Sequence, residues 1–343
     1  MNKDAVILIP SYNPDEAIMQ DFLGELSKRF KNIVIVNDGS DKIHDNFFGK
    51  LSNNYIVISH YKNLGKGRAL KTGINYILNE FPKLKVIVTA DCDGQHSVKD
   101  IEKCFKASLN NPESLVLGTR NFNDKNVPFK SKWGNKITRN MFKIFVGISI
   151  TDTQTGLRAM SKDIATKFLD VAGERYEYET NMLITCKNED IKIYEEGIDT
   201  VYINGNELSH FNPVKDSIII YKLFIKYILA SISSFVVDIL LFTIILSFID
   251  NLTYAILIST ILARIISSLY NYLINSKLVF KKMNKYSLIK YFTLVIIMMF
   301  VSGFAVDYLV KITTWNATLV KIIVDAIIFV INFIIQREFI FKK

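Results

Sequence analysis

Four residues with chemically useful side chains stand close together in the stretch VTADCDGQH, residues 88–96: Asp91, Asp93, Gln95 and His96. They come directly after a run of apolar residues that is typical of a buried strand. Carboxylate and amide oxygens are the ligands that Mg²⁺ and similar hard cations prefer. Polar residues also end many strands that bind nothing, so the stretch alone allows either a metal and substrate site or an ordinary turn.

The first half of the chain alternates short apolar runs with amphipathic stretches. The helical pattern occurs at 15–30, 65–81 and 98–110, and the strand-like runs lie at 5–10, 32–38, 55–60, 85–90 and 114–119. This alternation predicts an α/β fold with right-handed crossovers and a mainly parallel sheet that is covered on both faces. Because ligands of such sheets bind at the carboxyl ends of the strands, we expect the polar strand ends to form one site.

The residues at these strand ends favour an anionic ligand that contains phosphate. They read PSYNPDE after the first strand, NDGSD after the second and GTRN after the fifth. A divalent cation held by one or two carboxylates would neutralise a nucleotide diphosphate and stabilise it as a leaving group. The glycine-rich NLGKGRALKTG at 63–73 fits neither the Walker nor the dinucleotide pattern, which disfavours a P-loop ATPase or a dehydrogenase.

From residue 218 onward the composition is typical of a membrane domain. Four apolar segments are each near the ~20 residues that a helix needs to cross the hydrocarbon core: Tyr227–Ile249, Leu252–Asn275, Leu288–Val310 and Ala317–Ile335. Buried helices of a soluble protein are disfavoured, because these runs would leave too little polar surface. We therefore expect a soluble α/β domain at 1–217 and an α-helical four-span transmembrane domain at 218–343.

The charge distribution sets the expected topology. Residues 218–343 contain 13 Lys and Arg against 5 Asp and Glu, so the first 217 residues are nearly neutral, which argues against binding of nucleic acid. The positive-inside rule places the basic loop at 276–290 in the cytoplasm, and both termini with it. The protein would then be a multi-pass protein of the cell membrane with a cytoplasmic soluble domain. The three scattered cysteines predict free thiols.

The membrane half contains an internal repeat. Arg264–Lys281 aligns without a gap with Asp325–Lys342, which indicates two helical hairpins in parallel orientation. Arg264 lies in the middle of a span, where a charge needs a partner, and Asp325 or Asp238 could supply it. Such a pair could line a polar path for a lipid phosphate or could only fix helix packing.

Several motifs together resemble those of one enzyme family. The first ~215 residues resemble the family 2 glycosyltransferases of the polyprenyl-phosphate sugar synthase type, such as dolichyl-phosphate mannose synthase, and residues 218–343 resemble the GtrA-like four-helix membrane domain. The resemblance rests on DCDGQH, NLGKGRALKTG, DTQTGLRAM (152–160), ERYEYE (174–179) and SHFNPVKD (209–216). It implies a Rossmann-like GT-A fold. It also implies transfer of a hexose, with inversion, from a nucleotide-diphosphate sugar to polyprenyl phosphate such as undecaprenyl phosphate, for cell-envelope glycosylation.

The resemblance also implies which residues bind the donor. The nucleoside and its phosphates would lie against Pro10, Tyr12, Asp38, Lys66, Asp91 and Cys92. Asp93 and Gln95 would hold Mg²⁺ or Mn²⁺ against the diphosphate, whereas His96 could contact the donor or only pack in its loop. Two departures leave the nucleobase in doubt: Pro14 stands where the family has Glu, and Asn37 precedes Asp38 where the family has paired Asp.

On the acceptor side, the resemblance implies that Arg120 and Lys132 bind the lipid phosphate. A phosphate monoester is largely dianionic at neutral pH, so its oxygen is already a nucleophile and needs little help from a base. Asp152 of DTQTG would lie near the reacting sugar and would either orient it or take a proton.

The segment KSKWGNKITRNMFKIF at 130–145 has an amphipathic helical pattern. Its apolar face comprises Trp133, Ile137, Met141, Ile144 and Phe145, and its basic residues lie elsewhere around the helix. The pattern predicts a helix on the membrane surface, and its alternative is a helix packed on the core of its own domain.

Two other functions fit parts of this sequence. A processive polysaccharide synthase is disfavoured because neither Trp133 nor Trp315 lies in a Gln-x-x-Arg-Trp motif. A membrane transporter or scaffold for a lipid-linked sugar is the alternative from another class. UDP-glucose is the first choice of donor by family analogy, followed by UDP-N-acetylglucosamine and GDP-mannose. The apolar faces of the small transmembrane domain would also allow homo-oligomers to form.

Overall fold

The computed structural model describes residues 2–120, 135–136, 138–140, 142–199, 213–249, 255–280, 286–313, 315 and 317–341. The chain forms two compact units, Met1–Ile219 and Ile220–Lys343.

The first unit is built on a seven-stranded sheet in the order β3-β2-β1-β4-β6-β5-β7. The strands are β1 (Asn2–Ser11), β2 (Phe30–Asn37), β3 (Ile56–Ser59), β4 (Val86–Thr89), β5 (Ser114–Arg120), β6 (Arg158–Ser161) and β7 (Lys192–Ile198). β6 runs antiparallel to both of its neighbours, whereas the other pairs are parallel. The predicted α/β fold is confirmed, and the mainly parallel sheet contains one antiparallel strand that the sequence patterns did not indicate.

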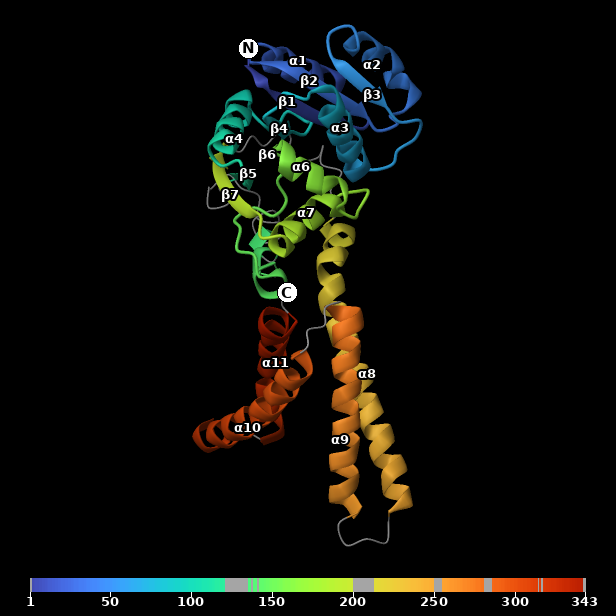
Figure 1. Ribbon diagram of the computed structural model, residues 1–343, viewed down its shortest axis with the longest axis vertical. Coiled ribbons are helices and arrows are strands. Elements are labelled where there is room, and N and C mark those ends of the chain that lie inside the picture. The colour runs from blue at the N-terminus through green and yellow to red at the C-terminus, as the bar shows by residue number, and fades with distance from the viewer. Residues whose placement is uncertain are drawn as a thin grey trace. The chain divides into compact units, whose positions relative to one another are not determined.

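Helices cover both faces of this sheet (Figure 1). α1 (Glu16–Ser27) and α4 (Val98–Asn110) pack on one face, and α3 (Lys66–Glu80), α6 (Lys162–Leu169) and α7 (Glu177–Asn188) lie on the other, while α2 (Asp45–Leu51) follows β2 and contacts β3. Side-chain caps explain where two of these helices begin: Asp15 accepts a hydrogen bond from Ile18 N at 3.1 Å, and Ser97 accepts one from Asp100 N at 3.1 Å. The strands β1, β2 and β4 read as continuous apolar runs because both of their faces are buried.

The two strands missing from the sequence prediction have weak local signals. β6 is four residues long and begins with Arg158, whose side chain is fully buried. β7 has the sequence KIYEEGI and lies at the edge of the sheet, where charged side chains are common because they prevent further strand pairing. In both cases the residues form a strand because they pair with neighbouring strands of the sheet.

The second unit contains four helices in its described residues. They are α8 (Pro213–Phe248), which begins before the boundary between the units, α9 (Ala255–Ile274), α10 (Ser287–Thr313) and α11 (Ala317–Ile335). Within the described residues, one helical stretch, Ile225–Ile245, is long and apolar enough to span a membrane, with a mean hydropathy of 2.4. The four-span organisation therefore stays a prediction.

A structural detail that the sequence did not show supports the internal repeat of this unit. α9 continues into a π-helical turn at Asn275–Val279, and α11 continues into one at Gln336–Ile340, the aligned position of the repeat. Asn275 Nδ2 donates to Gln336 Oε1 at 3.2 Å, so aligned residues of the two hairpins bind each other. The aligned rings of Phe280 and Phe341 stack with centroids 4.9 Å apart. Because π-helical turns are rare, their recurrence argues for a duplicated hairpin. The side chains of Arg264 and Asp325 lie outside the described set.

The bond between Asn275 and Gln336 makes a testable prediction about this unit. Replacing either residue by leucine should destabilise the protein, because it leaves the other buried amide without that partner. Replacing both should cost less than the sum, with a coupling free energy of about 0.6–1.7 kcal/mol. A double-mutant cycle of unfolding free energies in mixed micelles measures this coupling. A coupling of zero would show that the two hairpins do not depend on this contact.

Candidate active site

A cavity of about 540 Å³ lies at the carboxyl ends of β1, β2 and β4. It brings together seven of the residues that the sequence assigned to donor and metal binding: Pro10, Tyr12, Asp38, Lys66, Asp91, Cys92 and Asp93. These residues are spread over more than 80 positions of the chain and meet because parallel strands present their carboxyl ends at one edge of the sheet.

Asp38 holds the loop that leads into α3. Its carboxylate accepts hydrogen bonds from Leu64 N at 3.0 Å and Gly65 N at 2.7 Å. His60 Nδ1 lies 2.7 Å from the same carboxylate, and the other ring nitrogen of His60 lies 2.9 Å from Thr72 Oγ1. Most of the acceptor capacity of Asp38 is therefore used within the protein. The structure gives Asp38 a positioning role that the sequence did not indicate.

Lys66 lies between two carboxylates. Its Nζ is 2.7 Å from Asp91 Oδ1 and 3.0 Å from Glu179 Oε2. Burial disfavours the charged ammonium, but the two carboxylates outweigh this effect and raise the pKa of Lys66 above its ordinary value. Lys66 is therefore a permanent cation whose charge is already matched inside the protein.

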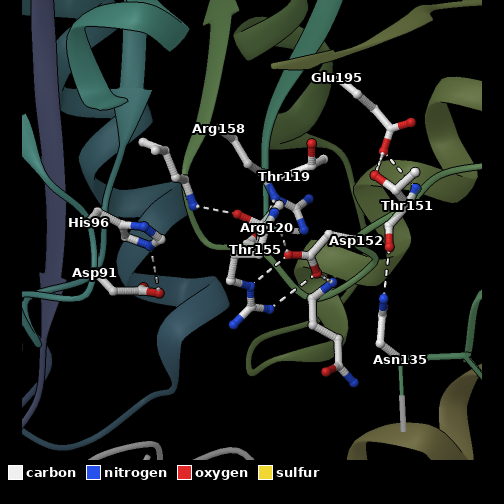
Figure 2. A network of polar contacts seen from close by, with 12 residues as sticks. Asp91, His96, Thr119, Arg120, Asn135, Thr151, Asp152, Thr155, Arg158 and Glu195 are labelled. Carbon is white, nitrogen blue, oxygen red and sulfur yellow. Dashed lines mark hydrogen bonds and ion pairs between the residues drawn. The ribbon is translucent and has the colours of Figure 1, made fainter. Parts of the chain in front are cut away.

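Asp91 is enclosed by its neighbours. His96 Nε2 lies 3.6 Å from Asp91 Oδ2. Figure 2 shows these two side chains facing each other. Burial opposes the charge on Asp91, but Lys66 and His96 lower the pKa of this carboxyl well below its ordinary value. A Cβ atom on Gly156 would meet the Asp91 carboxylate, so the glycine of DTQTG is required for this close approach. His96 is buried beside Asp91 and is not among the residues that line the cavity.

Asp93 has a different environment from Asp91. Its Oδ1 accepts a hydrogen bond from Gln95 N at 3.0 Å, and no cationic side chain is paired with it among the described residues. Burial and the charge of Asp91 raise the pKa of Asp93. Between them, Cys92 is kept as a thiol, because burial raises its pKa to about 11. Within the part of the chain that the structure describes, Asp93 is thus a carboxylate without a paired cation.

Asp93 lies at the cavity and fits a divalent cation that is shared with a ligand, whereas Gln95 is not among the residues that line the cavity. In the described parts of the chain, no three His, Cys, Asp or Glu side chains are grouped to enclose a metal. Mg²⁺ is commonly held by one or two carboxylates together with substrate phosphates, and such a site needs no cluster of protein ligands. The uncompensated charge of Asp93 at the cavity is consistent with this arrangement.

Arg120 and Asp152 form a bidentate ion pair (Figure 2). Arg120 Nε donates to Asp152 Oδ2 at 2.7 Å and Arg120 Nη2 donates to Asp152 Oδ1 at 3.1 Å. Asp152 is fully buried, whereas the side chain of Arg120 is 19% exposed. The sequence placed both residues near the reaction but did not indicate that they bind each other. Lys132, the other predicted acceptor ligand, lies outside the described residues.

The motif ERYEYE supplies site residues that the sequence reading did not name. Arg175 and Tyr176 line the cavity, and Glu179 pairs with Lys66. Arg158 of β6 donates to Glu179 O at 2.7 Å, which ties this segment to the sheet. A Cβ atom on Gly67 would clash with Tyr178, so the glycines of NLGKGRALKTG allow the two motifs to touch. The available signal was Lys66 between two glycines in one motif and the three glutamates of ERYEYE in the other.

The described part of the amphipathic segment packs on its own unit. Asn135, Thr138 and Phe142 are buried, and Asn135 Nδ2 donates to Thr151 O at 2.8 Å. Trp133, Ile137 and Met141 and the side chain of Phe145, which form most of the predicted apolar face, lie outside the described residues. The predicted contact of that face with the membrane stays a prediction.

Comparisons with known proteins agree with both halves of the chain. Residues 6–169 match Glycosyl transferase family 2, and residues 226–341 match the GtrA/DPMS transmembrane domain. An uncharacterised protein of Methanocaldococcus jannaschii is 33% identical over 234 residues, which are 66% of this chain and 94% of that protein. The UDP-N-acetylglucosamine–dolichyl-phosphate N-acetylglucosaminyltransferase of Methanococcus voltae is 31% identical over 239 residues, 63% of this chain and 93% of that one.

Among solved structures, the chain is similar to glucosyl-3-phosphoglycerate synthase of Mycobacterium tuberculosis in complex with Mn²⁺, UDP and glucosyl-3-phosphoglycerate. The TM-score is 0.49 and the identity 14%, over 65% of this chain and 77% of that one. The family match and the archaeal relatives carry the assignment by themselves. The chain belongs to glycosyl transferase family 2 and carries a GtrA/DPMS transmembrane domain in its C-terminal part.

Proposed function

We propose that the protein transfers a hexose from a nucleotide-diphosphate sugar to polyprenyl phosphate at the cytoplasmic face of the cell membrane. The product would be a polyprenyl-phosphate sugar for cell-envelope glycosylation. The observation that carries the proposal is the cavity at the strand ends, in which no cationic side chain of the described residues is paired with the carboxylate of Asp93. The relative from Methanococcus voltae, whose name states a dolichyl-phosphate acceptor, supports the lipid class.

The proposed reaction is a single displacement. An oxygen of the lipid phosphate forms a bond to the anomeric carbon while the bond from that carbon to the donor diphosphate breaks, and the nucleoside diphosphate leaves. The configuration at the anomeric carbon inverts. Because the phosphate dianion is already nucleophilic, the protein mainly has to hold the two anionic groups together and stabilise the leaving diphosphate.

Asp93 and Gln95 are the residues that would hold Mg²⁺ or Mn²⁺, which neutralises the diphosphate as it leaves. Asp38 and the loop it holds would place the nucleoside beside Pro10 and Tyr12.

On the acceptor side, Arg120 would present its guanidinium to the lipid phosphate while Asp152 fixes its orientation from behind. The ion pair favours an orienting role for Asp152, because proton uptake would break its contact with Arg120. Lys132 is proposed as the second phosphate ligand from the sequence alone. The four predicted spans would anchor the protein and present the acceptor.

Three nucleotide sugars are candidates for the donor. Family analogy favours UDP-glucose, the relative from Methanococcus voltae favours UDP-N-acetylglucosamine, and GDP-mannose is the third candidate. Purified full-length protein should convert undecaprenyl phosphate and one of these radiolabelled donors to a labelled lipid when Mn²⁺ or Mg²⁺ is present. EDTA should suppress the product.

A transporter would be supported if no donor gave a labelled lipid with either cation and if the protein moved a preformed lipid-linked sugar across vesicle membranes.

A further inference from the structure

The charged side chains that line the donor cavity differ in whether the protein already balances them. Asp38 is engaged by two backbone N–H groups and His60, and Asp91 is paired with Lys66. Lys66 is itself shared between two carboxylates. Asp93 and Arg175 are the two that remain, since neither has an oppositely charged side-chain partner within the described residues. Among the described residues, the cavity therefore presents one carboxylate and one guanidinium that are not paired with an opposite charge.

The backbone around Arg175 is held firmly, although its side chain is exposed. Arg68 N donates to Glu174 O at 2.9 Å, and Tyr178 N donates to Arg175 O at 3.2 Å. Gly65 lies so close to this turn that a Cβ atom there would meet Glu174 O and the Arg175 side chain. These contacts hold the backbone of Arg175 between the start of α3 and the start of α7.

This pair of unbalanced charges matches the chemistry of a metal-bound diphosphate. Each phosphate of a nucleotide-diphosphate sugar carries a negative charge, and a divalent cation at Asp93 leaves the complex of carboxylate, cation and diphosphate with a net negative charge. A guanidinium presents a fork of N–H donors that suits phosphate oxygens. Arg120, the other arginine of the predicted site, is already paired with Asp152.

We infer that Arg175 binds the diphosphate of the donor and so completes the charge balance that Asp93 begins. This inference rests on the proposed function, and it assigns a binding residue that the sequence motifs did not single out. The phosphates would then lie between the end of β4 and the turn before α7, with the nucleoside toward β1 and β2.

Equilibrium binding of UDP and of GDP in the presence of Mn²⁺ to the full-length protein tests the inference. Arg175→Gln should weaken binding of the preferred nucleotide roughly 10- to 100-fold, the range expected for loss of a hydrogen-bonded charge. The affinity of Arg175→Lys should lie between those of the wild type and Arg175→Gln, because lysine keeps the charge but not the planar fork of N–H donors. Arg29→Gln is the matched control, since Arg29 is an exposed arginine before β2 and does not line this cavity.

The outcomes separate the inference from the function on which it rests. If the wild-type protein binds neither nucleotide, the proposed function fails. If the wild-type protein binds one of them and Arg175→Gln binds it equally well, the inference is wrong. It is also wrong if Arg175→Gln raises only the KM for polyprenyl phosphate, which would place Arg175 at the acceptor. Unchanged thermal unfolding of Arg175→Gln would exclude misfolding as the cause of weaker binding.

Discussion

Asp93→Asn should reduce formation of the lipid-linked sugar at least about 100-fold, because it removes the carboxylate proposed to hold the divalent cation at the donor diphosphate. The fold should be unaffected. Asn can still accept the hydrogen bond from Gln95 N, and burial together with Asp91 already disfavours the negative charge at this position. Initial rates with saturating Mn²⁺, measured beside thermal unfolding, give both quantities.

Asp190→Asn is the matched control for this experiment. Asp190 is exposed and has a φ of 54°, a conformation that Asn adopts readily, and it does not line the donor cavity. Its replacement should leave both rate and stability unchanged. Full activity of Asp93→Asn would contradict the proposed role of Asp93 in holding the divalent cation at the donor diphosphate.

Asp152→Asn should destabilise the α/β unit by about 2–3 kcal/mol, because it leaves the guanidinium of Arg120 without its counter-charge. This value lies below the usual range for a buried pair, since Arg120 is partly exposed. The melting temperature should fall by roughly 4–12 °C. Activity should also fall, since Arg120 would lose the partner that orients it.

A double replacement distinguishes this orienting role from general base catalysis. Arg120→Met with Asp152→Leu removes both charges and should recover much of the stability, while transfer stays lost because the proposed phosphate ligand is absent. A contrary result would be an Asp152→Asn protein that melts like the wild type but has lost its kcat. That result would assign the proton-accepting role to Asp152.

Local sequence patterns were sufficient for most of the α/β unit. The apolar runs that became β1, β2, β4 and β5 are buried on both faces, so their signal does not depend on neighbours. The rule that strand ends meet at one edge then brought Pro10, Asp38 and Asp91 together. The apolar segments of the membrane half likewise became α8 to α11.

Other features of both units depended on contacts that no local pattern contains. β6 and β7 are strands because the sheet pairs them, and β6 starts with an arginine. The repeat was visible as aligned residues, but the bond between Asn275 and Gln336 required the two hairpins to be packed together.

The amino-acid sequence was enough to identify the chemical groups of this protein and to predict that Asp91, Asp93 and the residues assigned to the nucleoside meet at the strand ends. The folded structure was needed to show which of these charges are paired. It neutralises Lys66 with Asp91 and Glu179 and pairs Arg120 with Asp152, and it leaves Asp93 and Arg175 without such partners among the described residues. The physical reason is that periodicity and motif spacing report burial and chain direction, whereas charge pairing is set by side chains that come from distant parts of the chain.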